Sequence, residues 1–411
     1  MSLSSEERNF AGQLTTALCA LGCVLSLNEL ALAQGKYDDG ASDKEIRIGQ
    51  TVPYSGPLSV LGTLGKVQLA YFSKVNELGG INGRTVNLIS LDDAYQPSRT
   101  VEQTRKLVEE QKVLAMTGVG VPTSAAVQRY LNTKKVPQIF LATGAVRFAD
   151  PKNFPWTMGW MPLNVTEGKI YGKYIADNIP NAKIGVLYQN DDFGKDFLSG
   201  FKSGLGDKAA SLIVKETTYE VTDPTLDSQI ISLRSSGADV LFTGAAAKFG
   251  ALALRKVYDI GWKPTQFLAS TSTSIAINLR PIGLEKAVGV ISTRYLKDPS
   301  DPAWANDKAV QEYLAFLKKY APELDPNDTI GVIGYSIAQT IEHVLRNCGN
   351  DLTRENVMKQ PTSLKDVELP MLIPGIKLNT GPDDYVPIDQ LQLMKFDGQL
   401  WRGFGGISSG R

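Results

Sequence analysis

The chain has 411 residues, of which 43% are hydrophobic and 21% are charged. Its 43 acidic and 43 basic residues cancel, so the net charge is zero. This balance excludes the strongly basic surface that binds nucleic acids or anionic membranes, and we expect neither as a partner. Because one ordinary core rarely grows to this length, the chain should form two domains.

An export signal is predicted at residues 1–33. Residues 11–33 are apolar, rich in Leu and Ala, and end in Ala-Leu-Ala, which is typical of a cleavage site before Gln34. The apolar run is interrupted, which disfavours a transmembrane anchor. Lipid attachment at Cys23 and a buried N-terminal helix are the alternatives. We therefore expect an exported, periplasmic protein.

Removal of the signal leaves Cys348 as the one cysteine and His343 as the one histidine. An internal disulfide would need two cysteines, and a zinc cluster would need several Cys or His ligands. We therefore predict neither a metal nor another cofactor.

Beyond the signal, short apolar runs alternate with helical patterns. The first series predicts strands at 46–53, 85–91, 113–116 and 136–141, with helices at 62–76, 97–110 and from 122 onward. The second series predicts strands at 183–188, 214–219, 240–243 and 266–269, with helices at 164–178, 193–205, 226–235 and 248–260. This alternation predicts an α/β fold with two doubly wound, Rossmann-like lobes.

The remaining chain is expected to complete these lobes. It predicts a strand at 287–293, helices at 308–320 and 330–347, strands at 367–374 and 391–398, and a loose end at 403–411.

Two loops of small residues, 117–120 and 142–145, follow neighbouring expected strands. Ligands bind beyond the carboxyl ends of parallel strands, and bare loops let a ligand approach the backbone. The helix that begins near Thr123 would direct free N–H groups at the same space, which suits a carboxylate. The alternative is that the small residues only permit tight turns.

An enzyme is disfavoured. The single histidine lies in an expected helix, no Ser–His–Asp or Cys–His arrangement is visible, and no GxGxxG follows the first strand. The acidic pairs at 92–93 and 191–192 could serve acid–base chemistry, but adjacent residues in a loop point apart.

Six segments occur in a specific order: IRIGQTVPYSGPLSVLG, NELGGINGRTVNLISLDDAYQP, IFLATGA, VLYQNDDFGKD, VLFTGAA and FLASTS. With them, residues 45–397 resemble the leucine/isoleucine/valine-type periplasmic binding proteins, the solute receptors of bacterial ABC importers. The resemblance implies hinge closure around a small ligand, an inner-membrane permease as partner, and no reaction on the ligand. We also expect a monomer.

The family fold implies two lobes joined by crossings near Met161, Arg294 and Asp384. Lobe I would then comprise residues 43–161 plus 295–383, and lobe II residues 162–294 plus 384–411.

The resemblance also assigns the residues that would grip a ligand carboxylate. The family's serine position falls on Gly120, and its alanine–threonine pair falls on Ala142 and Gly144, so backbone contacts are kept while two hydroxyl contacts are lost. Nearby hydroxyls at Thr123, Ser124 and Thr143 are possible replacements, and helix capping or turn formation is their alternative role.

In amino-acid receptors of the family, an acidic residue in lobe II pairs with the ligand ammonium. That position falls on Thr271. A buried ammonium without a carboxylate is costly, which argues against an α-amino acid. The hydroxyl-rich loop around Thr271 suits a phenol, carbonyl or hydroxyl group instead.

The pocket-lining positions of the family fall on Leu61, Phe193, Ala245 and Ile330, which describe a wide apolar pocket. The chain also resembles a subgroup that binds aromatic carboxylates, through L-A-T-G-A followed by D-P-x-x-F-P-W. Positive partners for a carboxylate would be Arg147 and Arg294, with surface or hinge ion pairs as their alternative role.

These observations predict an extracytoplasmic receptor for a small carboxylate, an aromatic acid such as a benzoate or a hydroxycinnamate. The alternatives are a branched-chain amino-acid receptor of the same fold and the ligand-sensing module of a periplasmic signalling system.

Overall fold

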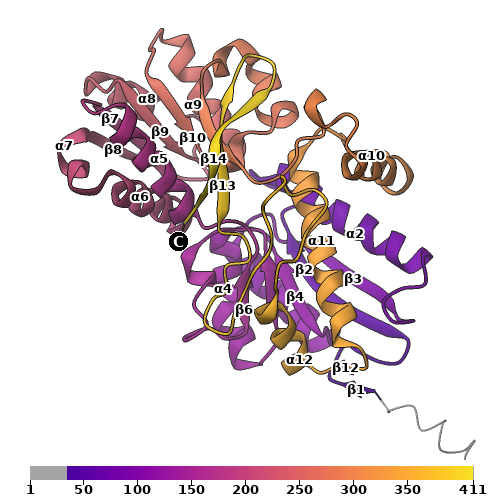
Figure 1. The fold of residues 1–411 in the computed structure, drawn as a ribbon. Coiled ribbons are helices and arrows are strands. Elements are labelled where there is room, and N and C mark those ends of the chain that lie inside the picture. Colours follow the sequence, from indigo (N-terminus) through magenta and orange to yellow (C-terminus); the bar gives the residue numbers. More distant parts are fainter. Residues whose placement is uncertain (1–34, 411) are drawn as a thin grey trace, which may run out of the picture.

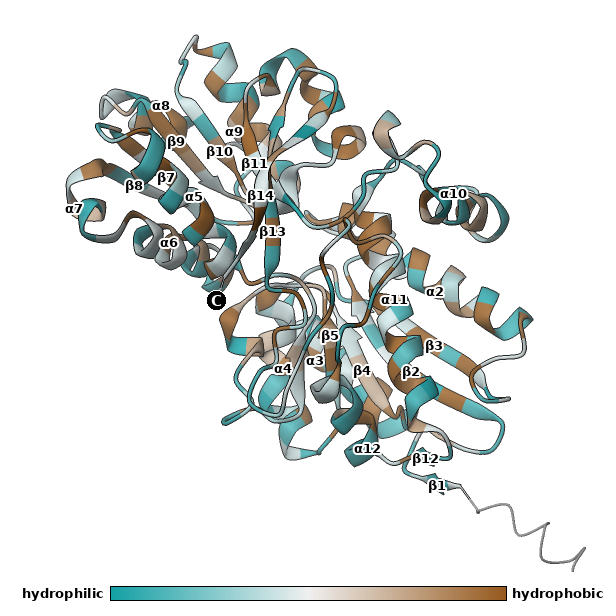
Figure 2. Cartoon of the chain, viewed as in Figure 1, coloured by the Kyte–Doolittle hydropathy of each residue, from teal (hydrophilic) through white to brown (hydrophobic). Residues whose placement is uncertain are grey.

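The computed structural model describes residues 35–410, which form two α/β halves stacked one above the other (Figure 1). The predicted signal at 1–33 and Cys23 lie outside the described residues. In both halves the central strands are mostly apolar and the helices alternate apolar and polar positions (Figure 2). This pattern follows from sheets that are covered by helices and therefore buried.

The first half is built on a five-stranded parallel sheet. Its spatial order is β3 (Thr85–Asp92), β2 (Glu45–Val52), β4 (Ala115–Gly118), β5 (Gln138–Leu141) and β6 (Thr157–Gly159). Its helices are α2 (Gly62–Glu77), α3 (Pro97–Arg105), α4 (Val121–Thr133), α10 (Lys308–Tyr320), α11 (Thr329–Cys348) and α12 (Arg354–Lys359). The carboxyl ends of β2, β4 and β5 therefore meet at one edge, which faces the other half.

Close packing of α2 against α11 depends on small residues. A Cβ atom at Gly334 would lie 2.6 Å from the carbonyl oxygen of Leu64, so only glycine fits at this approach. Tyr71, Phe316 and Tyr335 pack their rings together beside it, with centroids 5.0–6.1 Å apart. The one cysteine of this half, Cys348, is buried at the end of α11.

The second half is built on a seven-stranded mixed sheet. Its spatial order is β14 (Trp401–Ser409), β13 (Gln390–Phe396), β11 (Ile291–Arg294), β10 (Thr265–Leu268), β9 (Val240–Gly244), β7 (Ile184–Gln189) and β8 (Ile213–Tyr219). Its helices are α5 (Asn164–Asn178), α6 (Asp192–Leu205), α7 (Ala209–Leu212), α8 (Asp227–Ser235) and α9 (Lys248–Asp259). Strands β7 to β11 are parallel, whereas β13 and β14 are antiparallel additions at one edge.

The chain passes between the halves after β6, after β11 and before β13. These passages give the molecule the two-layered arrangement of doubly wound lobes, and the fold class predicted from the sequence is confirmed. The lobe boundaries predicted at individual residues stay predictions.

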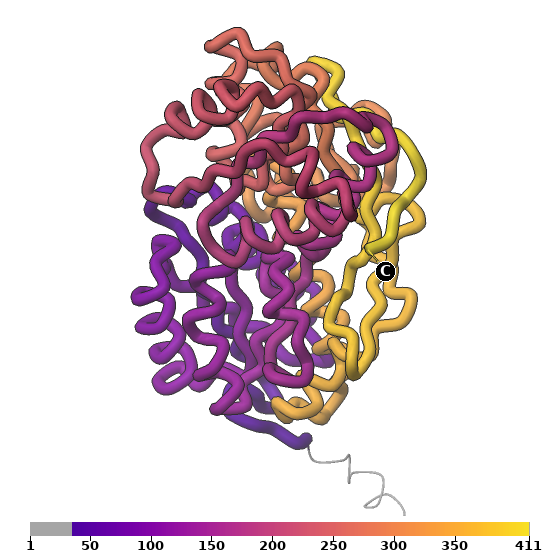
Figure 3. Tube along the Cα trace, turned by 90° about the vertical axis from the view of Figure 1, so that its left-hand side faces the viewer, coloured from indigo at the N-terminus to yellow at the C-terminus, as the bar shows by residue number. Residues whose placement is uncertain are grey.

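Two predictions for the C-terminal region were wrong. Residues 403–411 were expected to be loose, but 401–409 form β14, which pairs with β13. Residues 367–374 were expected to form a strand but make only isolated bridges, such as Val367 with Leu378. In Figure 3 this C-terminal segment, coloured orange to yellow, runs along one side of both halves. Both results depend on contacts with residues far away in the sequence, which the local sequence pattern does not reveal.

A small parallel pair, β1 (Lys36–Tyr37) with β12 (Asp351–Leu352), ties the start of the described chain to the first half. Within residues 35–410, no helix is both long and apolar enough to cross a membrane.

Candidate functional site

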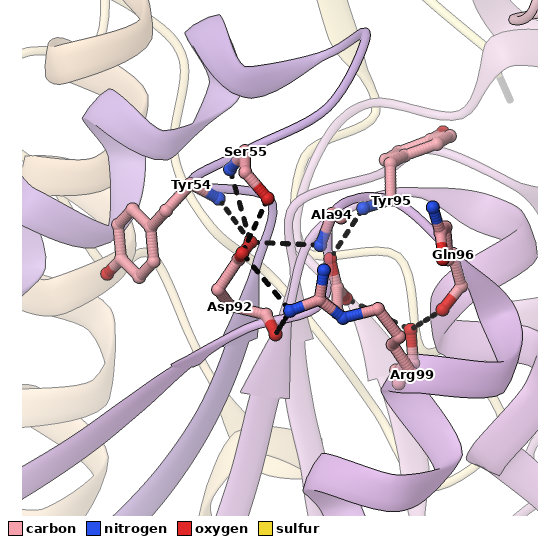
Figure 4. Close-up of polar contacts among 9 residues, drawn as sticks. Tyr54, Ser55, Asp92, Ala94, Tyr95, Gln96 and Arg99 are labelled. Carbon is pink, nitrogen blue, oxygen red and sulfur yellow. Dashed lines mark hydrogen bonds and ion pairs between the residues drawn. The ribbon is translucent and has the colours of Figure 1, made fainter.

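The loop after β3 is organised by one carboxylate, Asp92 (Figure 4). Its side chain accepts hydrogen bonds from the backbone N–H groups of Tyr54, Ser55 and Ala94 at 2.9, 3.2 and 2.9 Å. The Ser55 hydroxyl adds a bond of 2.6 Å. These bonds lower the pKa of Asp92 against the opposing effect of its desolvation. Asp92 thus fixes two loops at the rim of the cleft.

Tyr95 follows in the same loop and reaches the N-terminus of α4. Its φ is +60°, an uncommon value for tyrosine, and its ring lies against Gly120. A Cβ atom at Gly120 would lie 2.4 Å from Tyr95 Cε2, and the φ of Gly120 is +88°. Glycine is therefore required at position 120 by both the ring and the backbone.

The Tyr95 hydroxyl joins the two halves. Burial is the main cause of its raised pKa, while hydrogen bonds with Gln189 and the Val121 amide act in the opposite direction. Tyr219 donates to Gln189 Oε1 at 2.8 Å, and the Ala246 amide donates to Tyr219 Oη at 3.1 Å. A buried polar network therefore runs from the end of α4 into the second sheet.

A cavity lies between the halves beside this network. Its lining is apolar apart from Tyr95, Thr143, Asn164 and Thr271, and it contains no charged side chain. The Thr143 side chain is only 4% exposed, and its hydroxyl has no hydrogen-bond partner within residues 35–410. An unpaired buried hydroxyl is unusual, because such groups normally have a partner.

Three contacts hold the halves together around the cavity. Arg147 forms an ion pair of 2.7 Å with Asp192, and the Val146 amide donates to Asp196 at 2.8 Å. On the other side, the Ser274 hydroxyl donates to Asp328 at 3.4 Å. Each contact joins a residue of the first half to one of the second, so the described conformation is closed.

Burial raises the pKa of Asp196 to about 6 and that of Asp328 to about 6. Hydrogen bonds from the amides of Val146 and Ile330, respectively, oppose these shifts without cancelling them.

The family described as "Periplasmic binding protein" matches residues 45–399. The chain belongs to this family. A curated relative, Leu/Ile/Val-binding protein homolog 1 of Brucella abortus (strain 2308), is 25% identical over 358 residues, covering 82% of this chain and 88% of the relative. The resemblance predicted from the sequence motifs is therefore confirmed.

Solved structures share the fold. A substrate-binding periplasmic protein from Ralstonia solanacearum has a TM-score of 0.78 at 23% identity, over 87% of this chain and 100% of that one. A Thermus thermophilus structure described as a branched chain amino acid ABC transporter with bound valine has a TM-score of 0.79 at 15% identity, over 90% and 97%. A Rhodopseudomonas palustris BisB5 solute binding protein in complex with 3,4-dihydroxy benzoic acid has a TM-score of 0.74 at 19% identity, over 90% and 98%.

The protein is thus a type I periplasmic binding protein, a solute-binding receptor and not an enzyme. Membership implies an exported, periplasmic location. No cluster of three or more potential metal ligands occurs within the described part of the chain.

The cavity of this periplasmic binding protein brings together most of the residues predicted for the ligand. The predicted residues that line it are Leu61, Gly120, Ala142, Thr143, Gly144, Phe193, Thr271 and Ile330. Which of them contact a ligand stays a prediction.

The other predicted residues lie outside this cavity. Thr123 is buried and its hydroxyl donates to the Val119 carbonyl at 2.5 Å, while Ser124 is buried in the first turn of α4. Ala245 is buried behind the wall, where its carbonyl accepts a bond of 3.1 Å from Thr271. Arg147 is engaged by Asp192 at the edge of the cleft.

Arg294 lines a second, adjoining cavity and donates two hydrogen bonds to Gln392 Oε1 at 2.9 and 3.0 Å. Burial lowers its pKa. It does not line the cavity that holds Thr143.

Several of the backbone N–H groups expected to grip a carboxylate already have partners. The amide of Val121 meets the Tyr95 hydroxyl, and residue 122 is a proline without an N–H. The amides of Ala142 and Thr143 donate to the carbonyls of residues 118 and 141 at 2.9 and 2.8 Å. The Tyr95 side chain, which follows another strand, lies against the N-terminus of α4. Which backbone N–H groups would contact a ligand carboxylate stays a prediction.

Sequence reasoning missed Tyr95, Met161 and Asn164, which also line the cavity. A usable signal existed for Tyr95, because it follows β3 at the same sheet edge as the two small-residue loops. Met161 and Asn164 lie where the chain first passes between the halves, and only the closed arrangement places them beside the cavity.

Proposed function

We propose that this periplasmic binding protein is the receptor of an ABC importer that captures a small aromatic carboxylate between its lobes. The closed, loaded form would then be recognised by a permease in the inner membrane. The receptor would act as a monomer. The observation that carries this proposal is the uncharged, mainly apolar cavity that contains one unpaired, buried hydroxyl, Thr143.

The shape and chemistry of the walls support an aromatic ring. Phe193 offers a ring from the second half, and Leu61 and Ile330 offer aliphatic surface from the first. Burial of an aromatic ring between such walls gives a large hydrophobic gain.

The polar residues support a carboxylate at the Thr143 side of the cavity. The Thr143 hydroxyl has a hydrogen available, and Asn164 Nδ2 makes only a long bond of 3.4 Å, to the Phe193 carbonyl. No acidic side chain lines this cavity, so none repels an anion there. Donors placed in an apolar site stabilise a carboxylate, since each bond to a charged group contributes about 1.5–3 kcal/mol.

A branched-chain amino acid is the main alternative, because Brucella relatives carry Leu/Ile/Val-binding names and the Thermus structure is described with bound valine. The cavity provides no carboxylate for a ligand ammonium, which is the specific observation against it. A fatty acid is a further alternative, in view of the Thermomonospora curvata neighbour described as a fatty acid ABC transporter substrate-binding protein.

A thermal-shift screen tests the proposal. The protein without its predicted signal, residues 34–411, would be heated with benzoates, hydroxycinnamates, octanoate, leucine and valine. A ligand at 100 times its dissociation constant should add about 2.7 kcal/mol of stability, which is an easily measured rise in Tm. We expect the aromatic acids to raise Tm and the amino acids to leave it unchanged. A rise with leucine or valine alone would contradict the aromatic proposal.

A further inference from the structure

A second cavity adjoins the first. Met161, Thr271 and Ile333 line both cavities, so the two share a wall. The second cavity lies where the chain leaves β11, and its lining includes Arg294 and Tyr295. Methionine is flexible and adapts its shape to what it packs against, so this shared wall can yield to a ligand.

Tyr295 supplies the feature that singles out this cavity. Its side chain is 5% exposed, and its hydroxyl has no hydrogen-bond partner within the described chain. The residue is held firmly, because its ring packs 6.1 Å from that of Trp160 and its carbonyl accepts a bond of 3.0 Å from the Ile373 amide. A rigid, buried and unpaired hydroxyl at a cavity wall is a ready hydrogen-bonding partner for a ligand.

Neighbouring polar groups in the second cavity are already engaged. Ser270 donates to Glu167 through both its amide and its hydroxyl, each at 2.7 Å. Thr273 donates to the Ser270 carbonyl at 2.7 Å, and Arg294 donates to Gln392. The Tyr295 hydroxyl is therefore a buried group that a ligand can satisfy without breaking an existing bond.

The charges around this cavity favour a neutral ligand group. Asp298, Asp301 and Arg294 line it, and Glu167 lies behind Ser270 close enough for its charge to raise the pKa of Tyr295. Two carboxylates and one cation line the cavity, and the Arg294 guanidinium donates to Gln392 through Nε and Nη2. A second anion on the ligand would be repelled, whereas a neutral hydroxyl would not.

We propose that the two cavities form one elongated site, in which the ligand's carboxylate lies near Thr143 and a neutral hydroxyl at its far end hydrogen-bonds to Tyr295. This inference rests on the proposed function, because it takes the ligand to be a carboxylate. It narrows the expected ligands to carboxylic acids that carry a hydroxyl group at the end remote from the carboxylate. Thr271, on the wall between the cavities, would contact the middle of such a ligand.

Isothermal titration with matched ligand pairs tests this inference. The pairs are cinnamate with 4-hydroxycinnamate, octanoate with 8-hydroxyoctanoate, and isoleucine with 4-hydroxyisoleucine. We expect the hydroxylated member of the bound pair to have a Kd at least about tenfold lower, since a site built for a hydroxyl discriminates against a ligand that lacks it. Tyr295→Phe should reduce this ratio to threefold or less.

Tyr313→Phe is the matched control. Tyr313 is also a fully buried tyrosine whose hydroxyl has no partner within the described residues, but it lies in the core of the first half and lines neither cavity. It should keep the wild-type ratio. An unchanged ratio in Tyr295→Phe, or no preference in the unmodified protein, would overturn the inference.

A separate test, on the unmodified protein, asks whether the remote group of the ligand is neutral. This test needs no variant, so it remains available if Tyr295→Phe fails to fold. We expect 4-carboxycinnamate to bind more weakly than 4-hydroxycinnamate, and the opposite order would overturn a neutral remote group. If the octanoate or isoleucine pair binds and the cinnamate pair does not, the proposal of an aromatic ligand is contradicted. The ratio of the two Kd values within the pair that binds still decides whether Tyr295 recognises a remote hydroxyl. Binding of no pair would overturn both.

Discussion

At the scale of single residues, the contact between Gly120 and Tyr95 shapes the cleft. A Cβ at position 120 would meet the Tyr95 ring at 2.4 Å, and this buried ring cannot easily move. We expect Gly120→Ala to lower the free energy of unfolding by roughly 3 kcal/mol, from backbone strain and steric overlap together. Urea denaturation measures it.

Gly79→Ala is the control for backbone strain alone. The φ of Gly79 is +98°, but nothing lies within 4 Å of an added Cβ. Its loss should be about 1 kcal/mol. Equal losses in the two variants would show that the Tyr95 ring does not constrain position 120.

Thr143→Val should separate binding from stability. The substitution keeps the shape of the side chain and removes a hydroxyl that is unpaired within the described chain. We expect the Kd for an aromatic acid to rise roughly tenfold, while the free protein keeps or slightly gains stability. Titration calorimetry and urea denaturation give the two values. Thr217→Val, which removes another unpaired hydroxyl in β8 outside both cavities, should leave the Kd unchanged.

The strand-end rule directed attention to residues that the structure places at the cavity, although their contact with a ligand stays a prediction. Gly120 and Thr143 follow β4 and β5, and both line the cavity. The same rule did not reveal that the N-terminus of α4 is covered, because the covering hydroxyl comes from Tyr95 after a different strand. A contact between a side chain of one loop and the backbone of another cannot be predicted from the pattern of apolar and polar residues along the chain.

At the scale of elements, the first residue before α11 carries a pH-dependent contact. Asp328 accepts a bond of 3.0 Å from the Ile330 amide and lies near Thr63, Ser274 and Asp325. Burial raises its pKa to about 6. Because the folded-state pKa exceeds the unfolded one, its stabilising contribution is complete below about pH 4 and is lost as the pH rises to about 6.

Asp328→Asn keeps an acceptor for the Ile330 amide and removes the titration. We expect the variant to be as stable as the wild type near pH 4 and more stable by roughly 1–3 kcal/mol at pH 7. The measurement is urea denaturation across this pH range. A difference that does not grow with pH would contradict the raised pKa.

Asp307, which caps α10, provides a comparison because its pKa is lowered, whereas that of Asp328 is raised. It accepts a bond from the Val310 amide and pairs with Lys297 at 2.8 Å, and its pKa is lowered by these contacts against its desolvation. Asp307→Asn should therefore be less stable than the wild type above about pH 4, and urea denaturation should show this difference shrink as the pH falls below 4.

Elements with their own hydrophobic period were predicted to within a few residues, as for α5 and α9. β14 was not, because its Gly- and Ser-rich sequence has no strand pattern and its pairing with β13 is what orders it. The prediction for 367–374 was wrong in the opposite way: its apolar residues are buried, but they do not form a strand of either sheet.

At the scale of the whole molecule, closure joins the halves through partly exposed polar contacts. The side chains of the Arg147–Asp192 pair are 37% and 49% exposed, so the pair should contribute well under 1 kcal/mol. We expect Arg147→Gln to raise the ligand Kd two- to fivefold at low salt, with a smaller effect at 0.5 M salt because of screening. Titration calorimetry at both salt concentrations measures this.

Asp177→Asn is the matched control, since it breaks an exposed ion pair with Lys173 within one helix of the second half. It should leave the Kd unchanged. A loss much greater than fivefold for Arg147→Gln would instead indicate that Arg147 contacts the ligand itself.

The central claim is that the cleft binds an aromatic carboxylate and has no place for the ammonium of an amino acid. The most direct measurement is a calorimetric titration of the protein, residues 34–411, with 4-hydroxycinnamate and separately with leucine. We expect saturable binding of 4-hydroxycinnamate, with a negative heat-capacity change from apolar burial, and no binding of leucine. Saturable binding of leucine without binding of the aromatic acid would contradict the claim.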